Sequence, residues 1–432
     1  MPGLDFHPPV PANAGTQTES VSVGSKDTAF GQPASALGDL GPGIRRDERI
    51  EWAVRRSLDQ HLIRDHPRPV AVALSGGGDS LALTLIADAW AREAGRELLI
   101  FTVDHHLQAA SAVWTEACAQ TATRLNRPFR ALAWEGEKPA TGLPAAARAA
   151  RHRLIADAAR EGGAAVILMG HTADDALEAR TMREAGSTTP DPREWAPSPA
   201  WPQGRGVFLL RPTLGVRRAE LRRWLIKRGE TWIDDPANAD TRYARSRARA
   251  AAPAFVRVEP TAPIAPGLGV VVDGGSLVLD RPALRQAPIG AVRRVVAIAC
   301  VCAGGGDRRP AGARIARAAA AMLGAERFVS TLAGARIEAD GEVVRIAREP
   351  GEAARGGLTP LDLPVRQEVV WDGRFAVTAY APGLVVRAAH RANPQIVWPD
   401  GTVCSETPDV TIRPLVGPRF LAAAGFVDRE PA

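Results

Sequence analysis

The sequence contains no uninterrupted run of about 18 or more apolar residues, the length that a membrane-spanning helix requires. Its first residues lack the charged start and apolar block of a secretion signal. The four cysteines are scattered except for Cys300 and Cys302, and no histidines complete a set of four zinc ligands near that pair. These absences argue against a membrane protein, a disulfide framework and a structural zinc site. We expect a cytoplasmic protein with buried thiols.

Lysine is scarce, so the basic side chains, which outnumber the acidic ones by 54 to 48, are nearly all arginine. The planar guanidinium suits phosphate better than the point charge of lysine does. Arginine and alanine are frequent throughout the chain, however, and a compositional bias of the source genome would produce the same excess. The charge is therefore compatible with a nucleic-acid partner but does not establish one.

Composition divides the 432 residues into three parts. Residues 1–43 are rich in Pro, Gly, Ser and Ala without apolar periodicity, which predicts a disordered extension. Residues 44–250 alternate short apolar runs with helical segments. Residues 251–432 are punctuated by Pro and Gly around a helical stretch at 311–323, with short strands expected at 270–272, 276–279 and 376–377. Because the chain exceeds the usual size of one domain, we expect two folded domains, the second smaller and of α+β class.

The middle part has the sequence form of repeated βαβ units. A short helix containing Ile50, Trp52, Val54 and Leu58 is expected first. Short apolar runs predict strands at residues 70–74, 98–103, 130–134, 165–169 and 207–210. Helices are predicted at residues 79–94, 111–125, 144–161, 173–185 and 216–228. Parallel strands with helical crossovers form a doubly wound α/β sheet, whose ligands bind beyond the carboxyl ends of the strands.

A glycine-rich turn follows the first predicted strand and leads into a helix. It consists of Ser75, Gly76, Gly77, Gly78, Asp79 and Ser80. Glycines let the backbone approach an anion closely, while serine hydroxyls and helix-start N–H groups donate hydrogen bonds to it. The turn lacks the Gly-Lys-Ser/Thr of a Walker loop and the G-x-G-x-x-G of a dinucleotide fold. We predict a phosphate-binding turn of another type; the alternative is an ordinary strand-to-helix turn.

The SGGGDS segment resembles the S-G-G-x-D-S motif of PP-loop ATP pyrophosphatases. This resemblance implies a fold like that of the adenine nucleotide α-hydrolases. It also implies that the loop holds the pyrophosphate of ATP while a substrate oxygen attacks the α-phosphate. The implied cofactors are ATP and Mg²⁺, and the implied chemistry is adenylation rather than transfer of the γ-phosphate.

The end of the second predicted strand is similar to a motif of one branch of this class, the tRNA(Ile)-lysidine synthases. Val103-Asp104-His105-His106 is similar to their V-D-H-G, with His106 in place of the usual glycine. The resemblance implies that Asp104 and His105 border the adenosine of ATP. The alternative is an aspartate that only caps the following turn.

Residues 142–152, which lead into the helix predicted at 144–161, resemble the G-I-E-A-x-A-R-x-x-R-Y helix of the same family. Arg148 and Arg151 lie three residues apart, on one helical face that suits a phosphate or an RNA backbone. Pro144 replaces the usual Glu, which a first helical turn tolerates, and His152 replaces the usual Tyr. The alternative is a pair of solvated surface arginines.

Paired carboxylates follow the fourth predicted strand. Residues 170–178 are similar to the family's H-H-x-D-D-Q-x-E-T, with Ala176 and Ala179 in place of Gln and Thr. The resemblance implies that Asp174 and Asp175 act with Asp79 in catalysis, that Asp79 and Asp175 hold Mg²⁺, and that His171 and Glu178 contact the substrate. The alternative is that the two aspartates only stabilise a helix start through its dipole.

Residues 210–247 resemble the family's R-P-L-L, a basic helix, W-x-x-D-x-S-N-x-D and Y-x-R-N-x-x-R in succession. A basic amphipathic helix followed by an arginine ladder is suited to an RNA backbone. The resemblance implies tRNA contacts by Arg211 and Arg245. A solvated helix face crossed by ion pairs is the alternative.

Taken over residues 68–250, the resemblance implies an enzyme, a ligase that joins free L-lysine to C2 of the wobble cytidine of isoleucine tRNA with a CAU anticodon. The reaction passes through an adenylated tRNA and gives lysidine, AMP and pyrophosphate. The second domain is expected to bind tRNA or to have a structural role. Two alternatives stay open: a PP-loop tRNA thiolase, disfavoured because Cys118 is the only cysteine of the first domain, and a non-catalytic RNA-binding protein on the same scaffold.

Overall fold

The computed structural model describes residues 46–108, 110–186, 192–234, 269–324, 326–351, 357–404 and 409–431. The predicted extension at residues 1–43, both expected domain boundaries and Arg245 lie outside these ranges.

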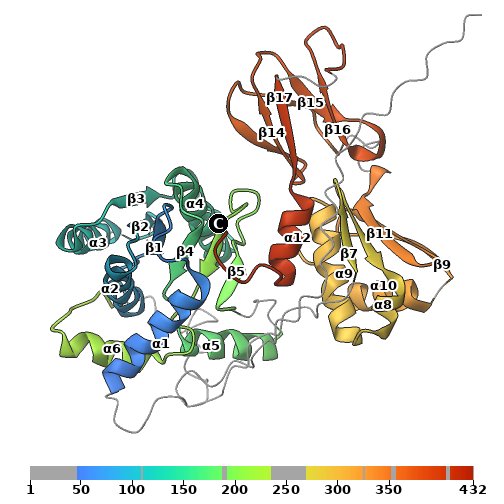
Figure 1. The fold of residues 1–432 in the computed structure, drawn as a ribbon. Helices are drawn as coiled ribbons and strands as arrows, with labels where there is room; N and C mark the ends of the chain where they lie inside the picture. Colours follow the sequence, from blue (N-terminus) through green and yellow to red (C-terminus); the bar gives the residue numbers. More distant parts are fainter. Residues whose placement is uncertain are drawn as a thin grey trace, which may run out of the picture.

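A six-stranded sheet forms the centre of the first part of the chain, in the order β3-β2-β1-β4-β6-β5 (Figure 1). Its strands are β1 (Val70–Ala73), β2 (Leu98–Asp104), β3 (Phe129–Ala133), β4 (Val166–Met169), β5 (Trp195–Pro197) and β6 (Phe208–Leu210). Neighbouring strands are parallel except for β5, which runs antiparallel to β6 at the edge. The predicted doubly wound sheet is therefore confirmed, and the edge strand β5 is an addition to it.

Helices cover both faces of this sheet. The helices of this part are α1 (Arg46–His61), α2 (Gly78–Glu93), α3 (Ser111–Leu125), α4 (Leu143–Glu161), α5 (Ala173–Glu184) and α6 (Arg218–Lys227). One face of the sheet shares a hydrophobic cluster with α1, α2, α3 and α6, and the other face packs on α4. The predicted helices of this part end within two residues of these bounds, except that the first helix is longer than expected.

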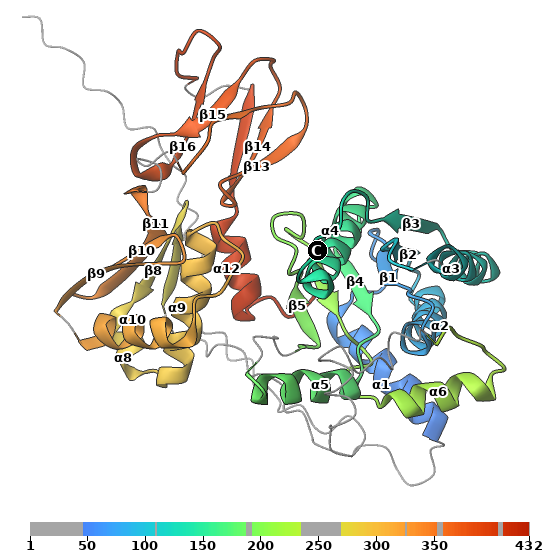
Figure 2. The ribbon, with the colours of Figure 1, turned by 180° about the vertical axis from the view of Figure 1, so that it is seen from behind.

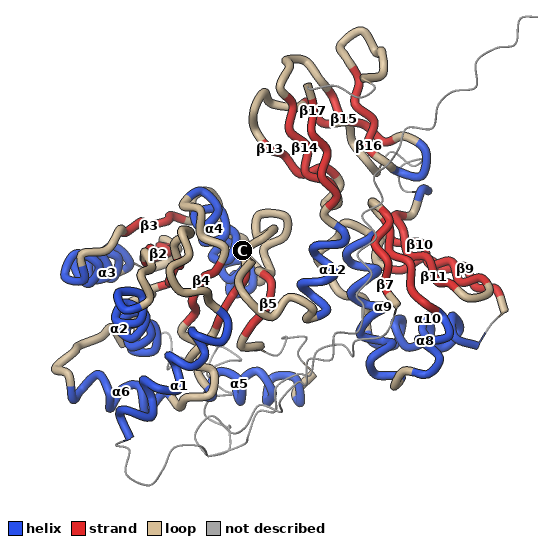
Figure 3. Tube along the Cα trace, in the orientation of Figure 1, coloured by secondary structure: helices blue, strands red, loops and turns tan. Residues whose placement is uncertain are grey.

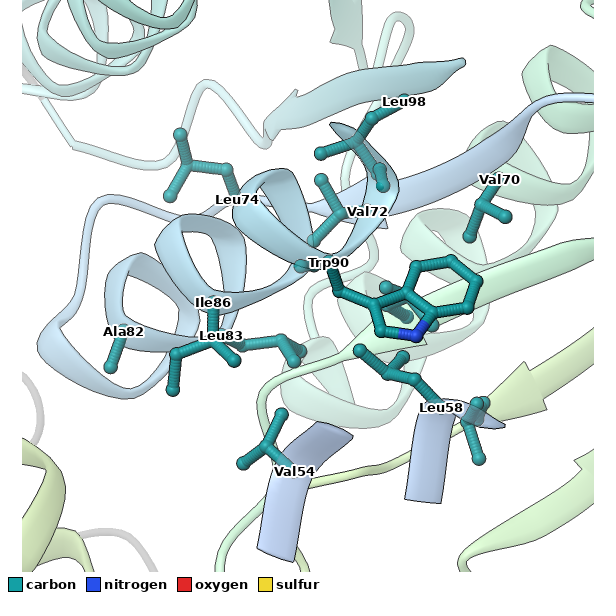
Figure 4. Packing of buried hydrophobic residues seen from close by; sticks show 14 of the residues in the cluster. Val54, Leu58, Val70, Val72, Leu74, Ala82, Leu83, Ile86, Trp90 and Leu98 are labelled. Carbon is teal, nitrogen blue, oxygen red and sulfur yellow. The ribbon is translucent and has the colours of Figure 1, made fainter. Parts of the chain in front are cut away.

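Trp90 of α2 anchors the larger of these clusters. Its ring is 1% exposed and lies between Leu58 of α1 and Val70 of β1 (Figure 4). The indole N–H donates a 2.9 Å hydrogen bond to Asp59. Truncating a buried tryptophan to alanine typically costs about 3–5 kcal/mol. This packing fixes α2, and with it the glycine turn at its N-terminus.

The second part of the chain begins with a five-stranded antiparallel sheet in the order β7-β8-β11-β10-β9. The strands are β7 (Val270–Asp273), β8 (Ser276–Asp280), β9 (Arg327–Leu332), β10 (Ala335–Asp340) and β11 (Val343–Arg348). Four helices belong to this layer: α8 (Arg281–Gln286), α9 (Ile289–Ala303), α10 (Gly312–Gly324) and α12 (Val416–Ala424). The predicted strands at 270–272 and 276–279 and the predicted helix at 311–323 are confirmed.

Two three-stranded sheets complete the second part, in the orders β12-β15-β16 and β13-β14-β17 (Figures 2 and 3). Their elements are β12 (Leu361–Asp362), β13 (Glu368–Trp371), β14 (Phe375–Ala379), β15 (Val385–Ala388), the short 3-10 helix η2 (His390–Ala392), β16 (Pro394–Val397) and β17 (Val410–Pro414). Only the strand at 376–377 was predicted here. The α+β class of this part is confirmed. None of the helices in the described ranges is long and apolar enough to cross a membrane.

Candidate nucleotide-binding and catalytic site

The glycine turn joins β1 to α2 at the carboxyl end of the central strand. The hydroxyls of Ser75 and Ser80 lie 3.0 Å apart, and Ser80 Oγ also accepts from the Ser75 backbone N–H at 3.1 Å and donates to Gly77 O at 2.9 Å. These bonds fix the turn. Gly77 is the N-cap residue and provides no side chain for the first-turn N–H groups of α2. Such groups at a helix start are well suited to hold a phosphate.

The three glycines of the turn have different neighbours. Gly76 has a φ of +81°, and a Cβ there would lie 2.4 Å from Ile233 Cδ1. A Cβ on Gly78 would lie 3.3 Å from the Trp232 ring, and Ile233 N donates to Gly76 O at 3.0 Å. A Cβ on Gly77, in contrast, would meet only Ser75 Oγ, at 3.6 Å. Two glycines thus admit the 232–233 segment, and Gly77 is the one of the three that leaves the turn open.

Gly170 brings the carboxylate-bearing turn onto the glycine turn. A Cβ at Gly170 would lie 2.8 Å from Ser80 Cα and 2.9 Å from Ser80 N, so only glycine permits this approach. Gly170 begins one of the motifs in the sequence, but no role was predicted for it. Because of this contact, the start of α5 lies beside Asp79, as expected for residues that follow adjacent parallel strands.

Three of the predicted carboxylates converge on one guanidinium, that of Arg218 at the start of α6. Arg218 Nε donates to Asp79 Oδ2 at 2.8 Å, and its terminal nitrogens lie 3.3 Å from Glu178 Oε1 and 3.4 Å from Asp175 Oδ1. The Glu178 side chain is 1% exposed. Burial lowers the pKa of Arg218, but the surrounding carboxylates outweigh burial and hold it above its ordinary value. Arg218 was not predicted as a site residue, because the composition of its helix indicated a surface that faces RNA.

Asp79 differs from the other carboxylates in having one unused oxygen. Its Oδ1 is buried and makes no hydrogen bond within the described part of the chain. Burial raises the pKa of Asp79, and the hydrogen bond from Arg218 offsets this only in part. Asp79 therefore retains an acceptor directed away from its protein partner.

Asp174 and Asp175 both stabilise helix starts. Asp175 Oδ2 accepts from the backbone N–H and the hydroxyl of Thr172, each at 2.8 Å, which forms a capping box on α5. Asp174 accepts two bonds from the Arg217 guanidinium, at 2.9 and 3.1 Å, and one from the Arg218 backbone N–H at 2.8 Å. Burial raises the pKa of Asp174, but these donors outweigh it and hold the pKa below its usual range. The alternative interpretation, that the two aspartates only stabilise a helix start, is thus supported in part.

The carboxylates were also predicted to bind Mg²⁺. No group of three or more His, Cys, Asp or Glu side chains in the described ranges is arranged to hold a metal ion. Protein-bound Mg²⁺ commonly takes only one or two carboxylates, together with substrate phosphates and water. Asp79, through Oδ1, fits such a role, whereas Asp175 already uses both oxygens in contacts with Thr172 and Arg218.

A cluster of arginines lies in a cleft near these carboxylates. Arg148 and Arg151 of α4 line it together with Arg211, which follows β6, and with His171. Arg211 is 6% exposed and donates to Arg193 O at 2.7 Å. Burial lowers the pKa of Arg211 to about 10, and the charges of Arg148 and Arg151 add to this effect. A bound anion would relieve this concentration of positive charge.

The histidines beside this cluster are neutral donors or acceptors. Burial holds the pKa of His171 and that of His152 well below the usual range. His171 Nδ1 and His152 Nε2 are buried and have no hydrogen-bond partner among the described residues. His105 also lines the cleft, with its ring edge-on to Trp134 at 5.9 Å. Because His171 lines the cleft, its Nδ1 is available to a ligand there, whereas His152 is not part of the lining.

The cleft has a volume of about 2260 Å³ and is lined from both parts of the chain. The first part contributes Arg148, Arg151, Arg211, His105 and His171 together with Asp175. The second part contributes five further arginines, Arg294, Arg308, Arg309, Arg413 and Arg419. The glycine turn is not part of this lining. The cleft is therefore suited to a large polyanion rather than to ATP alone.

The V-D-H segment forms a tight turn after β2. Asp104 Oδ1 accepts from the His106 backbone N–H at 2.7 Å, so Asp104 does cap this turn. His106 has a φ of +51°, the left-handed conformation that favours glycine. This conformation explains why the resembling motif has glycine at this position.

Departures from the family pattern fall on positions that the fold accommodates. Pro144 occupies the first turn of α4, as predicted. Ala176 and Ala179 are 2% and 8% exposed, so small side chains fill these buried positions.

Cys118 is buried beneath the glycine turn, with Sγ 3.7 Å from Leu74 O, and burial raises its thiol pKa. A thiol in this setting is a poor nucleophile, which counts against thiolase chemistry.

The predicted basic helix uses much of its charge within the protein. Besides Arg217 and Arg218, Arg222 lies 2.6 Å from Asp234, and Arg228 pairs with Glu51. For these residues the alternative interpretation, a solvated helix face crossed by ion pairs, is therefore the correct one.

Comparison with known proteins gives a consistent result. A family model described as a PP-loop domain matches residues 50–253. The tRNA(Ile)-lysidine synthase of Caulobacter vibrioides is 43% identical over 413 residues, which cover 87% of this chain and 98% of that protein. The tRNA(Ile)-lysidine synthase of Methylobacterium nodulans is 34% identical over 71% of this chain and 97% of its own length. A solved U34-tRNA thiolase from Methanococcus maripaludis overlaps 48% of this chain and 72% of its own, at 15% identity and a TM-score of 0.40.

The match to the two tRNA(Ile)-lysidine synthases extends over nearly their whole length. The residues matched by the PP-loop model include the glycine turn and the carboxylates that surround Arg218. The chain belongs to the tRNA(Ile)-lysidine synthase family and carries the PP-loop ATP-binding domain of that family.

Proposed function

We propose that this chain ligates L-lysine to C2 of the wobble cytidine in isoleucine tRNA with a CAU anticodon, in the cytoplasm, by way of an adenylated tRNA. The observation that carries the proposal is the contact of Gly170 with Ser80, which joins the phosphate-binding turn to the carboxylates at the edge of the arginine-lined cleft. ATP, a base and an amine could all meet there.

In this proposal the glycine turn holds the pyrophosphate of ATP. The first-turn N–H groups of α2 donate to it, the two serine hydroxyls fix the turn around it, and Gly77 leaves the backbone accessible. Asp104 and His105 border the adenosine. Mg²⁺ would be held by Asp79, with Asp175 nearby, and would offset the negative charge of the phosphates.

The first step joins the tRNA to AMP. The cytidine O2 attacks the α-phosphorus, the bond to the β-phosphate oxygen breaks, and pyrophosphate leaves. Turning the wobble base out is inexpensive because anticodon bases are already single-stranded. Arg148, Arg151 and Arg211 would hold RNA phosphates, with His171 donating or accepting at the cleft wall. Arg245 and the second domain would extend this contact.

The second step forms the C–N bond. The lysine amine attacks C2, the C2–O bond breaks, and AMP leaves. An incoming ammonium must lose a proton first. Asp79 would hold Mg²⁺ and would therefore be a poor base, and the lowered pKa of Asp174 makes it a better partner for the ammonium than an acceptor of its proton. Asp175 and Glu178 would orient the amine.

The test is transfer of radiolabelled lysine to unmodified CAU tRNA by the purified chain with ATP and Mg²⁺. The labelled lysine should appear in the CAU tRNA, and no label should appear in a tRNA whose wobble base is uridine. RNA binding without pyrophosphate release would instead support the non-catalytic alternative. Asp79→Ala should abolish pyrophosphate release and leave tRNA affinity largely intact.

A further inference from the structure

Residues 427–431 return from the second part of the chain to the first, where they lie against α1 and β5 (Figures 1 and 2). We call this segment the strap. Trp195 Nε1 donates to Val427 O at 2.8 Å, and Glu430 N donates to His61 O at 2.8 Å. The Trp195 ring is itself stacked between His61 and Phe208, with centroids 5.1 and 4.8 Å away. The strap is therefore bound to a rigid edge of the first sheet.

A buried ion pair holds the end of the strap. The Glu430 carboxylate accepts two bonds from the Arg96 guanidinium, each 2.9 Å long, and both side chains are 0% exposed. The Ile63 backbone N–H donates to the same carboxylate at 3.2 Å, and Arg96 also donates to Arg68 O. Removing one partner from such a pair leaves the other buried without its counter-charge, which is strongly destabilising. The strap is thus bound to the first part by a specific buried ion pair rather than by surface contact alone.

A second tie joins the two parts at a different place. Glu368 of the second part accepts from Arg205 of the first at 2.8 Å, and Arg160 lies 3.3 Å away. Trp201 Nε1 donates to Gly373 O at 2.8 Å. Burial raises the pKa of Glu368, but its arginine partners outweigh this and lower it to about 2.

Both ties border the arginine-lined cleft. Its lining includes Val427 and Pro431 of the strap, and Arg160, Arg205 and Arg413 around Glu368. The arginines of the second part are thereby held at a fixed distance from those of the first. The arginines on the two sides of the cleft repel each other because they carry the same charge. Attractive contacts, such as the ion pairs of Glu430 and Glu368, are therefore needed to keep the two parts of the chain together.

We infer that the strap is a positioning element, in which Arg96 and Glu430 hold the arginines of the second part where they reach one RNA molecule together with Arg148, Arg151 and Arg211. This inference rests on the proposed function for its ligand, a tRNA. An RNA long enough to reach both sets gains from their fixed spacing, because the second set then binds at high effective concentration. An isolated anticodon stem-loop would reach only the first set.

The experiment compares the affinity of two fluorescent RNAs, full-length unmodified CAU tRNA and its anticodon stem-loop, by anisotropy. Deleting residues 427–432 should weaken binding of the full-length tRNA by about tenfold, less than the roughly hundredfold or greater gain from linking two sites, because the chain still connects the two parts. Binding of the stem-loop should change by less than about twofold. E430Q removes the negative charge of the buried pair, and W195F removes the bond to Val427 O; both should act in the same direction by less, and W195F provides the test if the other two variants do not fold.

The matched control is E161Q, which alters an exposed ion pair of 2.9 Å with Arg130 in the same part of the chain and should affect neither RNA. Unchanged affinity of folded strap variants for full-length tRNA would overturn the inference. Equal weakening of both RNAs would also overturn it, because the strap would then only support the fold of the first part. Binding needs no lysine transfer, so a chain that fails as a ligase still gives a decisive result.

Discussion

Arg218 Nε lies 2.8 Å from Asp79 Oδ2, and this contact joins the start of α6 to the glycine turn across 139 positions of sequence. The same guanidinium reaches Glu178 and Asp175. One cation therefore balances three partly or fully buried carboxylates, while the other oxygen of Asp79, Oδ1, makes no hydrogen bond among the described residues. The arrangement assigns Arg218 to the positioning of the acidic residues.

Arg218→Gln should lower tRNA-dependent pyrophosphate release by about tenfold or more, because the carboxylates lose their common counter-charge and Asp79 loses its orientation. Arg218→Lys should recover part of the rate, since it keeps the charge but not the guanidinium fork. The control is Arg223→Gln, an exposed arginine of the same helix whose Nε donates to Ala219 O. A full rate in Arg218→Gln would remove Arg218 from the account.

Alanine at two of the glycines should separate folding from nucleotide binding. Gly76→Ala should lower the free energy of unfolding by about 2 kcal/mol, from its left-handed φ and its clash with Ile233. Gly77 has a φ of −69°, so Gly77→Ala should alter stability by less than about 0.5 kcal/mol. It should still weaken ATP binding because its methyl group faces the open turn. Urea unfolding and nucleotide titration measure the two effects. Equal ATP affinity in Gly77→Ala and the unaltered chain would contradict a phosphate at this position.

Arg211→Met should stabilise the fold while weakening tRNA binding. A pKa lowered to about 10 from 12.5 means that the folded state disfavours the buried charge by about 3 kcal/mol, at 1.4 kcal/mol per unit. Removal of the bond to Arg193 O offsets part of this, which leaves an expected gain of about 1 kcal/mol. Affinity for tRNA should fall by about tenfold, because the variant cannot donate to an RNA phosphate. Arg130→Met, at an exposed ion pair, is the control. Weaker folding of Arg211→Met would show that Arg211 serves stability instead.

His152→Tyr, which introduces the family's usual residue, should make stability less sensitive to acid. Burial holds the pKa of His152 well below 6.5 in the folded chain, so the unfolded chain binds the extra proton as the pH falls below 6.5. Folding stability is then lost on that side, by up to about 1.4 kcal/mol per pH unit. Between pH 7.5 and 5.5 the unaltered chain should lose about 1 kcal/mol more than His152→Tyr in urea unfolding. Equal losses would mean that His152 takes up its proton in the folded state.

The sequence was most informative where function and fold both depend on neighbours in the chain. The glycine turn, the strands of the first sheet and the carboxylates of α5 are each defined by spacing within a few residues. Motif spacing therefore predicted the turn and the carboxylates, and short apolar runs predicted every strand of this sheet except the edge strand β5. The structure departs from the predicted strand bounds by two residues or fewer. In the second part the strands are short and interrupted by Pro and Gly, so α9 and most of the small sheets gave no clear periodic signal.

Contacts between distant segments could not be predicted in the same way. Arg218 lies in a helix whose composition indicated an RNA-facing surface, and nothing in the local pattern shows that its partner is Asp79. Glu430 and Arg96 are 334 positions apart, and their pairing depends on the path that the chain takes after α12. The role of Gly170 is similar, because its need for a small residue arises only from the approach of Ser80.

The most direct test of the central claim uses ATP labelled in turn on the α- and the γ-phosphate, with CAU tRNA and no lysine. If the glycine turn holds the pyrophosphate while the tRNA is adenylated, the α-label should appear on the tRNA and the γ-label in pyrophosphate. Addition of lysine should then release the α-label as AMP. Release of the γ-label as orthophosphate, or tRNA that never carries the α-label, would contradict the account.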